Sequence, residues 1–128
     1  MRPGLALLPL LVSGGALLAG AASAAIVELR FDDQGRFARQ ASVPAGKFFE
    51  VCGPLAAGQA VAWQYAGPAP LDFNIHYHVG KAVHYPARLK QTASAQDRFT
   101  PDAARDYCWM WTNRGAEAAP LDMQLQRR

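Results

Sequence analysis

Strict alternation of apolar and polar side chains is the feature that most constrains the fold. In the segment LDFNIHYHV, every second residue is apolar: Leu71, Phe73, Ile75, Tyr77 and Val79. The same period recurs in shorter segments: Val27 to Phe31, Val61 to Tyr65, Tyr107 to Trp111 and Leu121 to Leu125. Because successive side chains of a strand point to opposite faces, this period predicts strands with one buried face. With turn residues between the segments and no long helical period, we predict an all-β fold, an antiparallel β-sandwich.

One segment departs from the alternation. Residues 88–99, RLKQTASAQDRF, mix charged, polar and small side chains without a period of two. We therefore expect a loop or a turn of helix there.

The first 24 residues have the composition of a secretory signal peptide. Arg2 precedes an apolar run that ends in Ala22-Ser23-Ala24, the small-x-small pattern of a cleavage site. A retained membrane anchor is the alternative, but Gly14, Gly15 and Gly20 interrupt the run and no cationic cluster follows it. We predict cleavage after Ala24, one domain at 25–128 without a membrane anchor, and a periplasmic or secreted location.

The charge of the predicted domain argues against nucleic acid as a partner. The chain has 13 Lys and Arg against 10 Asp and Glu, and the leader removes one of the cations, Arg2. The remaining cations are scattered from Arg30 to Arg128. A nucleic-acid-binding face needs clustered cations.

The chain has two cysteines, Cys52 and Cys108. In an exported protein such a pair tends to oxidise, so we predict a disulfide that pins the sandwich. It would close a loop of about 57 residues and contribute on the order of 4 kcal/mol to stability. A redox or metal-binding pair is the alternative, but it usually has the close C-x-x-C spacing that this chain lacks.

Several motifs resemble the GOLD domain of the emp24/p24 cargo proteins. They are Cys52 followed by Gly58 and Val61, the strand LDFNI, the strand DYCWMWTN with Cys108, and a final PLDMQL. The resemblance implies a β-sandwich, a bond between Cys52 and Cys108, and a role in protein recognition. It implies no metal ligands at the histidines. Since the chain ends soon after the last predicted strand, we expect a stand-alone version without the membrane helix of that family.

All three histidines lie within nine residues. Alternation places His76 and His78 on the polar face, with Cα atoms about 6.6 Å apart. A two-residue turn at 80–81 would pair Tyr77 with His84 and send His84 to the apolar face. A three-residue turn at 80–82 would pair His78 with His84 instead. We expect the second register because it pairs apolar with apolar residues, although Gly80 suits the shorter turn.

In that register His76, His78 and His84 form a candidate site for copper or zinc, both of which bind neutral imidazole. Asp72 and Asn74 lie in the same row and could orient a ligand, and Met110 could supply a soft one. The alternative is a solvated sheet face whose histidines have no ligand.

The sequence offers no pattern for an enzyme. No histidine follows His84, which excludes a blue-copper order of ligands, and no serine lies in a nucleophile elbow. We expect a non-enzymatic binding domain whose partner is a metal ion or a protein. Trp63, Trp109 and Trp111 either fill the core or form an interface, and a small sandwich favours the core.

The leader assignment predicts that protein recovered from the exported fraction begins at Ala25. Intact mass spectrometry checks it, and a mass that includes residues 1–24 would remove the basis for an exported protein.

Overall fold

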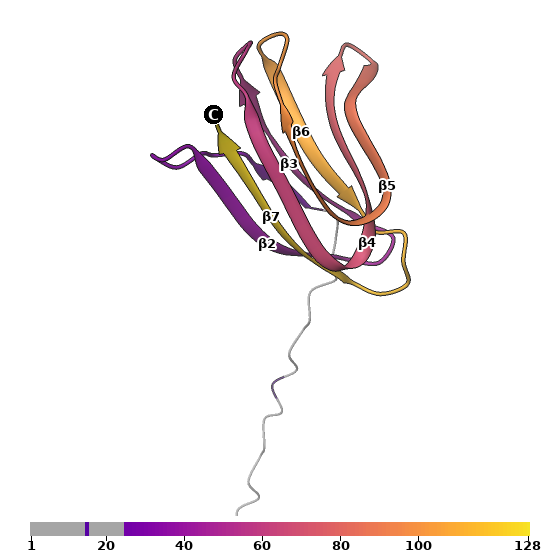
Figure 1. Ribbon diagram of the computed structural model, residues 1–128. Coiled ribbons are helices and arrows are strands. Elements are labelled where there is room, and N and C mark those ends of the chain that lie inside the picture. The colour runs from indigo at the N-terminus through magenta and orange to yellow at the C-terminus, as the bar shows by residue number, and fades with distance from the viewer. Residues whose placement is uncertain (1–14, 16–24) are drawn as a thin grey trace, which may run out of the picture.

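The computed structural model describes Gly15 and residues 25–128, so the predicted signal peptide lies, apart from Gly15, outside the described residues. Residues 25–128 form seven strands and no helix: β1 (Ala25–Glu28), β2 (Arg36–Val43), β3 (Phe48–Leu55), β4 (Val61–Val79), β5 (Ala82–Phe99), β6 (Arg105–Thr112) and β7 (Ala119–Arg127) (Figure 1). Accordingly, this part of the chain contains no helix that could cross a membrane.

The strands are hydrogen-bonded in the order β1-β3-β6-β4-β7-β2, and β5 pairs with β4 outside this path. Neighbouring strands are antiparallel except for β1, which lies parallel to β3. The prediction of an all-β, sandwich-like domain is confirmed, with the qualification that one pair of strands is parallel.

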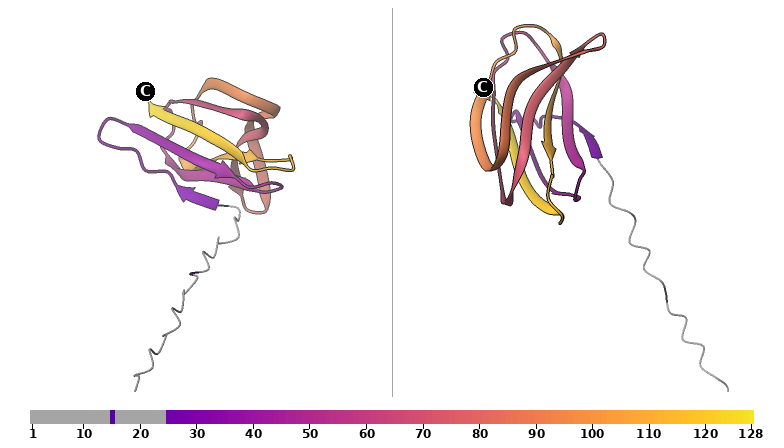
Figure 2. Two further views of the ribbon diagram at one scale, coloured as in Figure 1. Left: turned by 90° about the horizontal axis from the view of Figure 1, so that it is seen from below. Right: turned by 90° about the vertical axis from the view of Figure 1, so that its right-hand side faces the viewer.

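Strand β4 joins the two layers of the sandwich. Its first half, 61–66, pairs with β7, and its second half, 72–76, pairs with β6. Between the halves lie Gly67, Pro68 and Pro70. Proline has no amide hydrogen, so it cannot donate a hydrogen bond to a neighbouring strand. A Cβ atom at Gly67 would collide with the carbonyl oxygen of Pro120, so only glycine lets β7 approach the bend so closely. The strands therefore curl around a shared interior (Figure 2).

Aromatic side chains from both halves of β4 and from β6 fill this interior. The ring centroids of Phe73 and Trp63 are 4.6 Å apart, and those of Tyr65 and Trp111, which meet edge to face, are 5.7 Å apart. All three tryptophans are buried, with at most 6% of their surface exposed. The prediction that they belong to the core is confirmed.

The expectation of a loop or helical turn at 88–99 is wrong, because these residues belong to strand β5. Strand β5 pairs with β4 along both halves of the sandwich, and most of its side chains are exposed. Backbone pairing rather than burial holds it in place, so it does not need the apolar alternation that marks the inner strands. Strand β2, also absent from the predicted segments, buries Phe37 and Val43 against the core.

The expected three-residue turn between β4 and β5 is also wrong. The structure pairs Val79 with Ala82 and Tyr77 with His84, which leaves Gly80 and Lys81 as a two-residue turn. Gly80 has φ +59°, whereas Lys81 is not in the positive-φ region, as a type II′ turn requires. Below the turn, two residues of β5, Tyr85 and Pro86, oppose the single residue His76. This bulge separates the register of the hairpin tip from that of the buried pairs below it.

The predicted bond between Cys52 and Cys108 is confirmed. The two cysteines face each other on the adjacent strands β3 and β6, with Cα atoms 4.1 Å apart. Their neighbours Val51 and Trp109 point into the core, so the disulfide lies on the outer face of its layer. It therefore ties two strands of one layer rather than the two layers.

Removing this cross-link should destabilise the domain because the unfolded chain regains the freedom of a long loop. We expect the double variant Cys52→Ala/Cys108→Ala to lose about 2–4 kcal/mol of unfolding free energy. Urea titration followed by tryptophan fluorescence measures the change. Equal unfolding free energies for variant and wild type would contradict it.

Candidate functional site

The outer face of the layer formed by β1, β3, β6 and the second half of β4 holds the candidate site. Across β3, β6 and β4, Cys52 pairs with Cys108, and Cys108 pairs with His76. The adjacent row, on the same face, consists of Glu50, Met110 and Asn74. Because directly opposed residues on one face lie side by side, the ladder brings their sulfur, nitrogen and oxygen atoms together.

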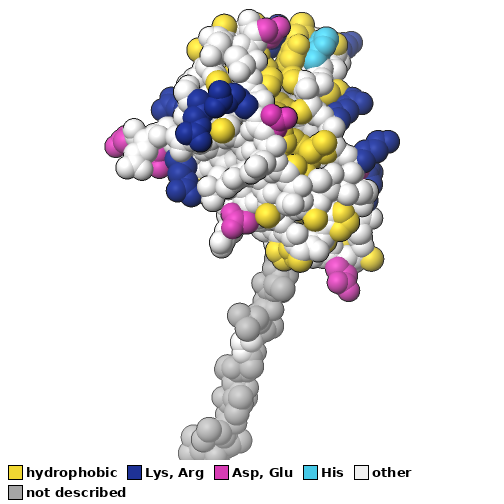
Figure 3. All heavy atoms as spheres, in the orientation of Figure 1, with side chains coloured by type: hydrophobic (Ala, Val, Ile, Leu, Met, Phe, Trp, Pro, Cys, Tyr) yellow, Lys and Arg dark blue, Asp and Glu magenta, His cyan; other side chains and the backbone are white. Residues whose placement is uncertain are grey.

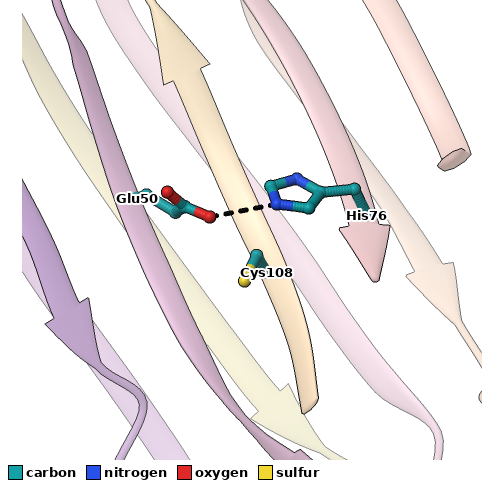
Figure 4. A group of neighbouring side chains, drawn as sticks. All are labelled: Glu50, His76 and Cys108. Atoms are coloured by element: carbon teal, nitrogen blue, oxygen red, sulfur yellow. Dashed lines mark ion pairs between the residues drawn. The ribbon is translucent and has the colours of Figure 1, made fainter. Parts of the chain in front are cut away.

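His76 is the centre of this group. Its side chain is buried, and its Nε2 atom lies 3.1 Å from Oε1 of Glu50 (Figure 4). Its Nδ1 atom lies 2.7 Å from Oδ1 of Asn74. Since the Asn74 oxygen can only accept, Nδ1 donates its hydrogen there. The other ring nitrogen, Nε2, then faces the carboxylate of Glu50.

The sulfur atoms lie beside this pair. Ligand atoms of Glu50, His76 and Cys108 all lie within 4.8 Å of one another. The Sγ atom of Cys52 is 3.3 Å from Oε1 of Glu50. We call Glu50, Cys52, His76 and Cys108 the buried cluster. It combines one imidazole, one carboxylate and two sulfurs, which in the disulfide have no proton to donate.

The structure brings His76 and His78 together but places His84 elsewhere. The rings of His76 and His78 are nearly perpendicular, with centroids 5.3 Å apart. His84 stacks on Tyr77 at 5.0 Å, and Tyr77 packs in turn against the core residue Tyr107. The two-residue turn causes this separation, since it pairs His84 with an inward-facing residue.

The predicted supporting residues have different positions. Asn74 contacts His76, and Met110 occupies the row between Glu50 and Asn74. Glu50, which the sequence analysis missed, is an acid within an otherwise apolar strand, two residues before Cys52 and therefore on the same face. That spacing is the signal that could have identified it.

Asp72 takes no part in the buried cluster. Its Oδ1 atom accepts hydrogen bonds from the backbone and side chain of Gln91, and its Oδ2 atom pairs with Arg114 at 2.7 Å. These bonds, the Arg114 contact first among them, lower the pKa of Asp72 to about 2. Gln91 has φ +45° and lies in a second bulge of β5, so Asp72 holds this irregular backbone against β4.

A second surface lies along the β4–β5 hairpin. Val83 and Tyr85, which lie on the same face as His76 and His78, are 38% and 42% exposed. Between Gly80 and Phe99 the cations are Lys81, Arg88, Lys90 and Arg98, against one acid, Asp97. We call Lys81, Val83, Tyr85 and Arg88 the hairpin surface.

The hairpin surface combines apolar and cationic groups. The guanidinium of Arg88 lies 3.6 Å above the ring of Tyr85, so the two side chains present one flat unit. In Figure 3 apolar side chains and a histidine lie side by side at one end of the molecule, and cations follow the adjoining edge. Such a surface suits an acidic, partly apolar partner.

Comparison with known proteins gives similarity of fold. No protein-family model and no curated protein sequence matches the chain. Among solved structures, PliG of Aeromonas hydrophila, a periplasmic inhibitor of g-type lysozyme, is similar with a TM-score of 0.68 and 15% identity, over 83% of this chain and 98% of that one. PliG of Salmonella Typhimurium has a TM-score of 0.61 at 15% identity, over 80% and 97%. The pre-peptidase C-terminal domain of a Bacillus anthracis collagenase has 0.57 at 10%, over 81% and 95%. At these identities the likeness establishes the fold, and no GOLD domain is among these three.

The contacts of Asp72 predict a specific acid dependence. Its folded pKa lies below the ordinary value, so its stabilisation is complete above about pH 4 and is lost as pH falls toward about 2. Asp72→Asn should lower the unfolding free energy by about 1 kcal/mol at pH 7. The difference from wild type should vanish near pH 2 in urea titrations at stepped pH.

Asp33→Asn, in the exposed turn before β2, is the matched control and should leave stability unchanged. A deficit of Asp72→Asn that persists unchanged at pH 2 would contradict the role of the ionised carboxylate.

Proposed function

We propose that the protein is an exported, non-enzymatic domain that binds a protein partner through the hairpin surface. The observation that carries this proposal is the exposure of Val83 and Tyr85 beside Arg88 on one face of the hairpin, with Lys81 at its turn. Aromatic residues and arginine dominate the binding energy of interfaces, and Tyr85 and Arg88 are already arranged as a pair. Recognition of a protein is also what the resemblance to the GOLD domain implies.

The partner we propose is a lysozyme of the g type. PliG proteins of two bacteria share this fold and are periplasmic inhibitors of that enzyme class. Glycoside hydrolases generally have carboxylates in a cleft that holds the sugar chain. A hairpin whose tip carries Lys81, and whose second strand carries Arg88, complements such a cleft in charge. The proposed location, periplasmic or secreted, would place the inhibitor where wall-cleaving enzymes act.

A second candidate function is metal binding by the histidines. His76 and His78 lie on one face with ring centroids 5.3 Å apart, so two of the three expected ligands for copper or zinc are neighbours. His84 would have to reach them from the other face of the hairpin, which weakens this candidate relative to protein binding.

The lysozyme proposal is tested with purified g-type lysozyme and a suspension of bacterial cells whose lysis is followed by turbidity. We expect the protein to inhibit lysis and Lys81→Glu/Arg88→Glu to inhibit at least tenfold more weakly, about 1.4 kcal/mol, because reversed charges repel the carboxylates. Tyr85→Ala should weaken inhibition to a similar extent. Added salt should weaken the wild type more than the charge-reversed variant.

Lys47→Glu is the matched control, since Lys47 precedes β3 at the end of the layer away from the hairpin tip. It should inhibit like the wild type. Lysis at the full rate in a large excess of wild-type protein would exclude g-type lysozyme as the partner. Undiminished inhibition by all the hairpin variants would exclude the hairpin surface.

A further inference from the structure

The buried cluster does more than pin two strands. We infer that reduction of the Cys52–Cys108 bond converts this cluster into a zinc site, with Cys52, Cys108, His76 and Glu50 as ligands. This inference is independent of the hairpin surface and of the lysozyme proposal.

The first argument is the ladder. Cys52, Cys108 and His76 occupy one row across three adjacent strands, and Glu50 lies one position along the same face of β3. Zinc takes four ligands in a tetrahedron, and bond lengths of about 2.0–2.3 Å place the ligand atoms about 3.3–3.8 Å apart. The Nε2–Oε1 separation is already 3.1 Å, ligand atoms of Glu50, His76 and Cys108 lie within 4.8 Å of one another, and the Cys52 sulfur is 3.3 Å from Oε1 of Glu50. Side-chain rotation alone can therefore close the site.

The second argument is the orientation of His76. Its Nδ1 atom donates to Asn74 at 2.7 Å, which leaves Nε2 directed at Glu50 and the sulfurs. Zinc-binding histidines are generally fixed in this way by a hydrogen bond from the other ring nitrogen. Here the supporting bond is present while the cysteines are still joined.

The third argument is burial. Glu50 and His76 are 8% and 5% exposed, and a carboxylate this deep needs a positive partner. In the oxidised protein the Nε2 atom of His76 lies 3.1 Å from this carboxylate. In the reduced protein a zinc ion would supply the positive charge and also compensate the charge of two thiolates.

A phosphine can reduce the Cys52–Cys108 disulfide in two steps. The phosphorus attacks one sulfur, the S–S bond breaks, and the second sulfur leaves as a thiolate that takes a proton. Water then cleaves the phosphorus–sulfur bond, which gives a phosphine oxide and a second thiol. The phosphine supplies both electrons. Zinc binding then releases the two thiol protons to solvent.

The experiment uses protein without a histidine tag, reduced by a phosphine, freed of it without oxygen, and titrated with Co²⁺ as a spectroscopic substitute for Zn²⁺. We expect one equivalent to bind, with visible bands of tetrahedral cobalt and a near-ultraviolet band from thiolate to metal charge transfer. Zn²⁺ should displace the cobalt. The oxidised protein should bind at least 100-fold more weakly, because its sulfurs are joined to each other.

Two variants test the remaining ligands. His76→Ala and Glu50→Gln should each weaken binding to the reduced protein at least tenfold. His84→Ala, a histidine on the other face of the hairpin, is the matched control and should bind like the wild type. Circular dichroism of each reduced variant reports its fold. If His76→Ala fails to fold, Glu50→Gln decides the assignment.

Several outcomes would overturn the inference. One is a reduced protein that binds no cobalt, or that unfolds on reduction and does not refold with zinc. Another is equal affinity in the oxidised and reduced forms, which would favour a site made by His76 and His78 without sulfur. A loss of affinity with His84→Ala but not with His76→Ala would also overturn it.

Discussion

The hydrogen bonding of β4 to two different neighbours is the interaction on which the rest of the structure depends. One strand pairs with β7 before its bend and with β6 after it, so a single segment belongs to both layers. The inward side chains of its two halves then face each other, and Trp63, Tyr65 and Phe73 become one aromatic cluster. Burial of such large rings is the main source of stability for a small domain. The outward side chains after the bend include Asn74 and His76, so the same strand also positions the candidate site.

The alternation of β4 and β6 made the core predictable, because buried strands cannot avoid a period of two when one face is packed. The disulfide was predictable because two cysteines have only one pairing available. Strand β5 was not predicted because it is an edge strand, which is held by backbone pairing while most of its side chains are exposed. Its residues Arg88, Lys90 and Gln91 show no period at all. A period of two in the sequence therefore identifies only those strands that bury one face.

The candidate site was only partly predictable for a different reason. The position of His84 depends on the register at the hairpin tip, where the turn preference of Gly80 prevailed over the sorting of apolar residues. The bulge at Tyr85 and Pro86 makes this possible, because it lets the tip and the buried pairs take different registers. Glu50 was missed because its partner His76 is 26 residues away and on a different strand. The buried cluster and the hairpin surface are neighbours, since the ring centroids of His76 and Tyr85 are 6.0 Å apart.

The irregularities of β5 have a consequence for how the protein associates with others. A long free edge is a template on which another strand could continue the sheet, and repeated addition leads to aggregates. Here Pro86 removes one donor, two bulges turn the backbone out of line, and Lys90 lies beside the second bulge. A foreign strand would find the run of donors and acceptors interrupted between Tyr85 and Gln91. Addition of a strand is therefore hindered along this part of the edge, and recognition there depends on side chains rather than on the backbone.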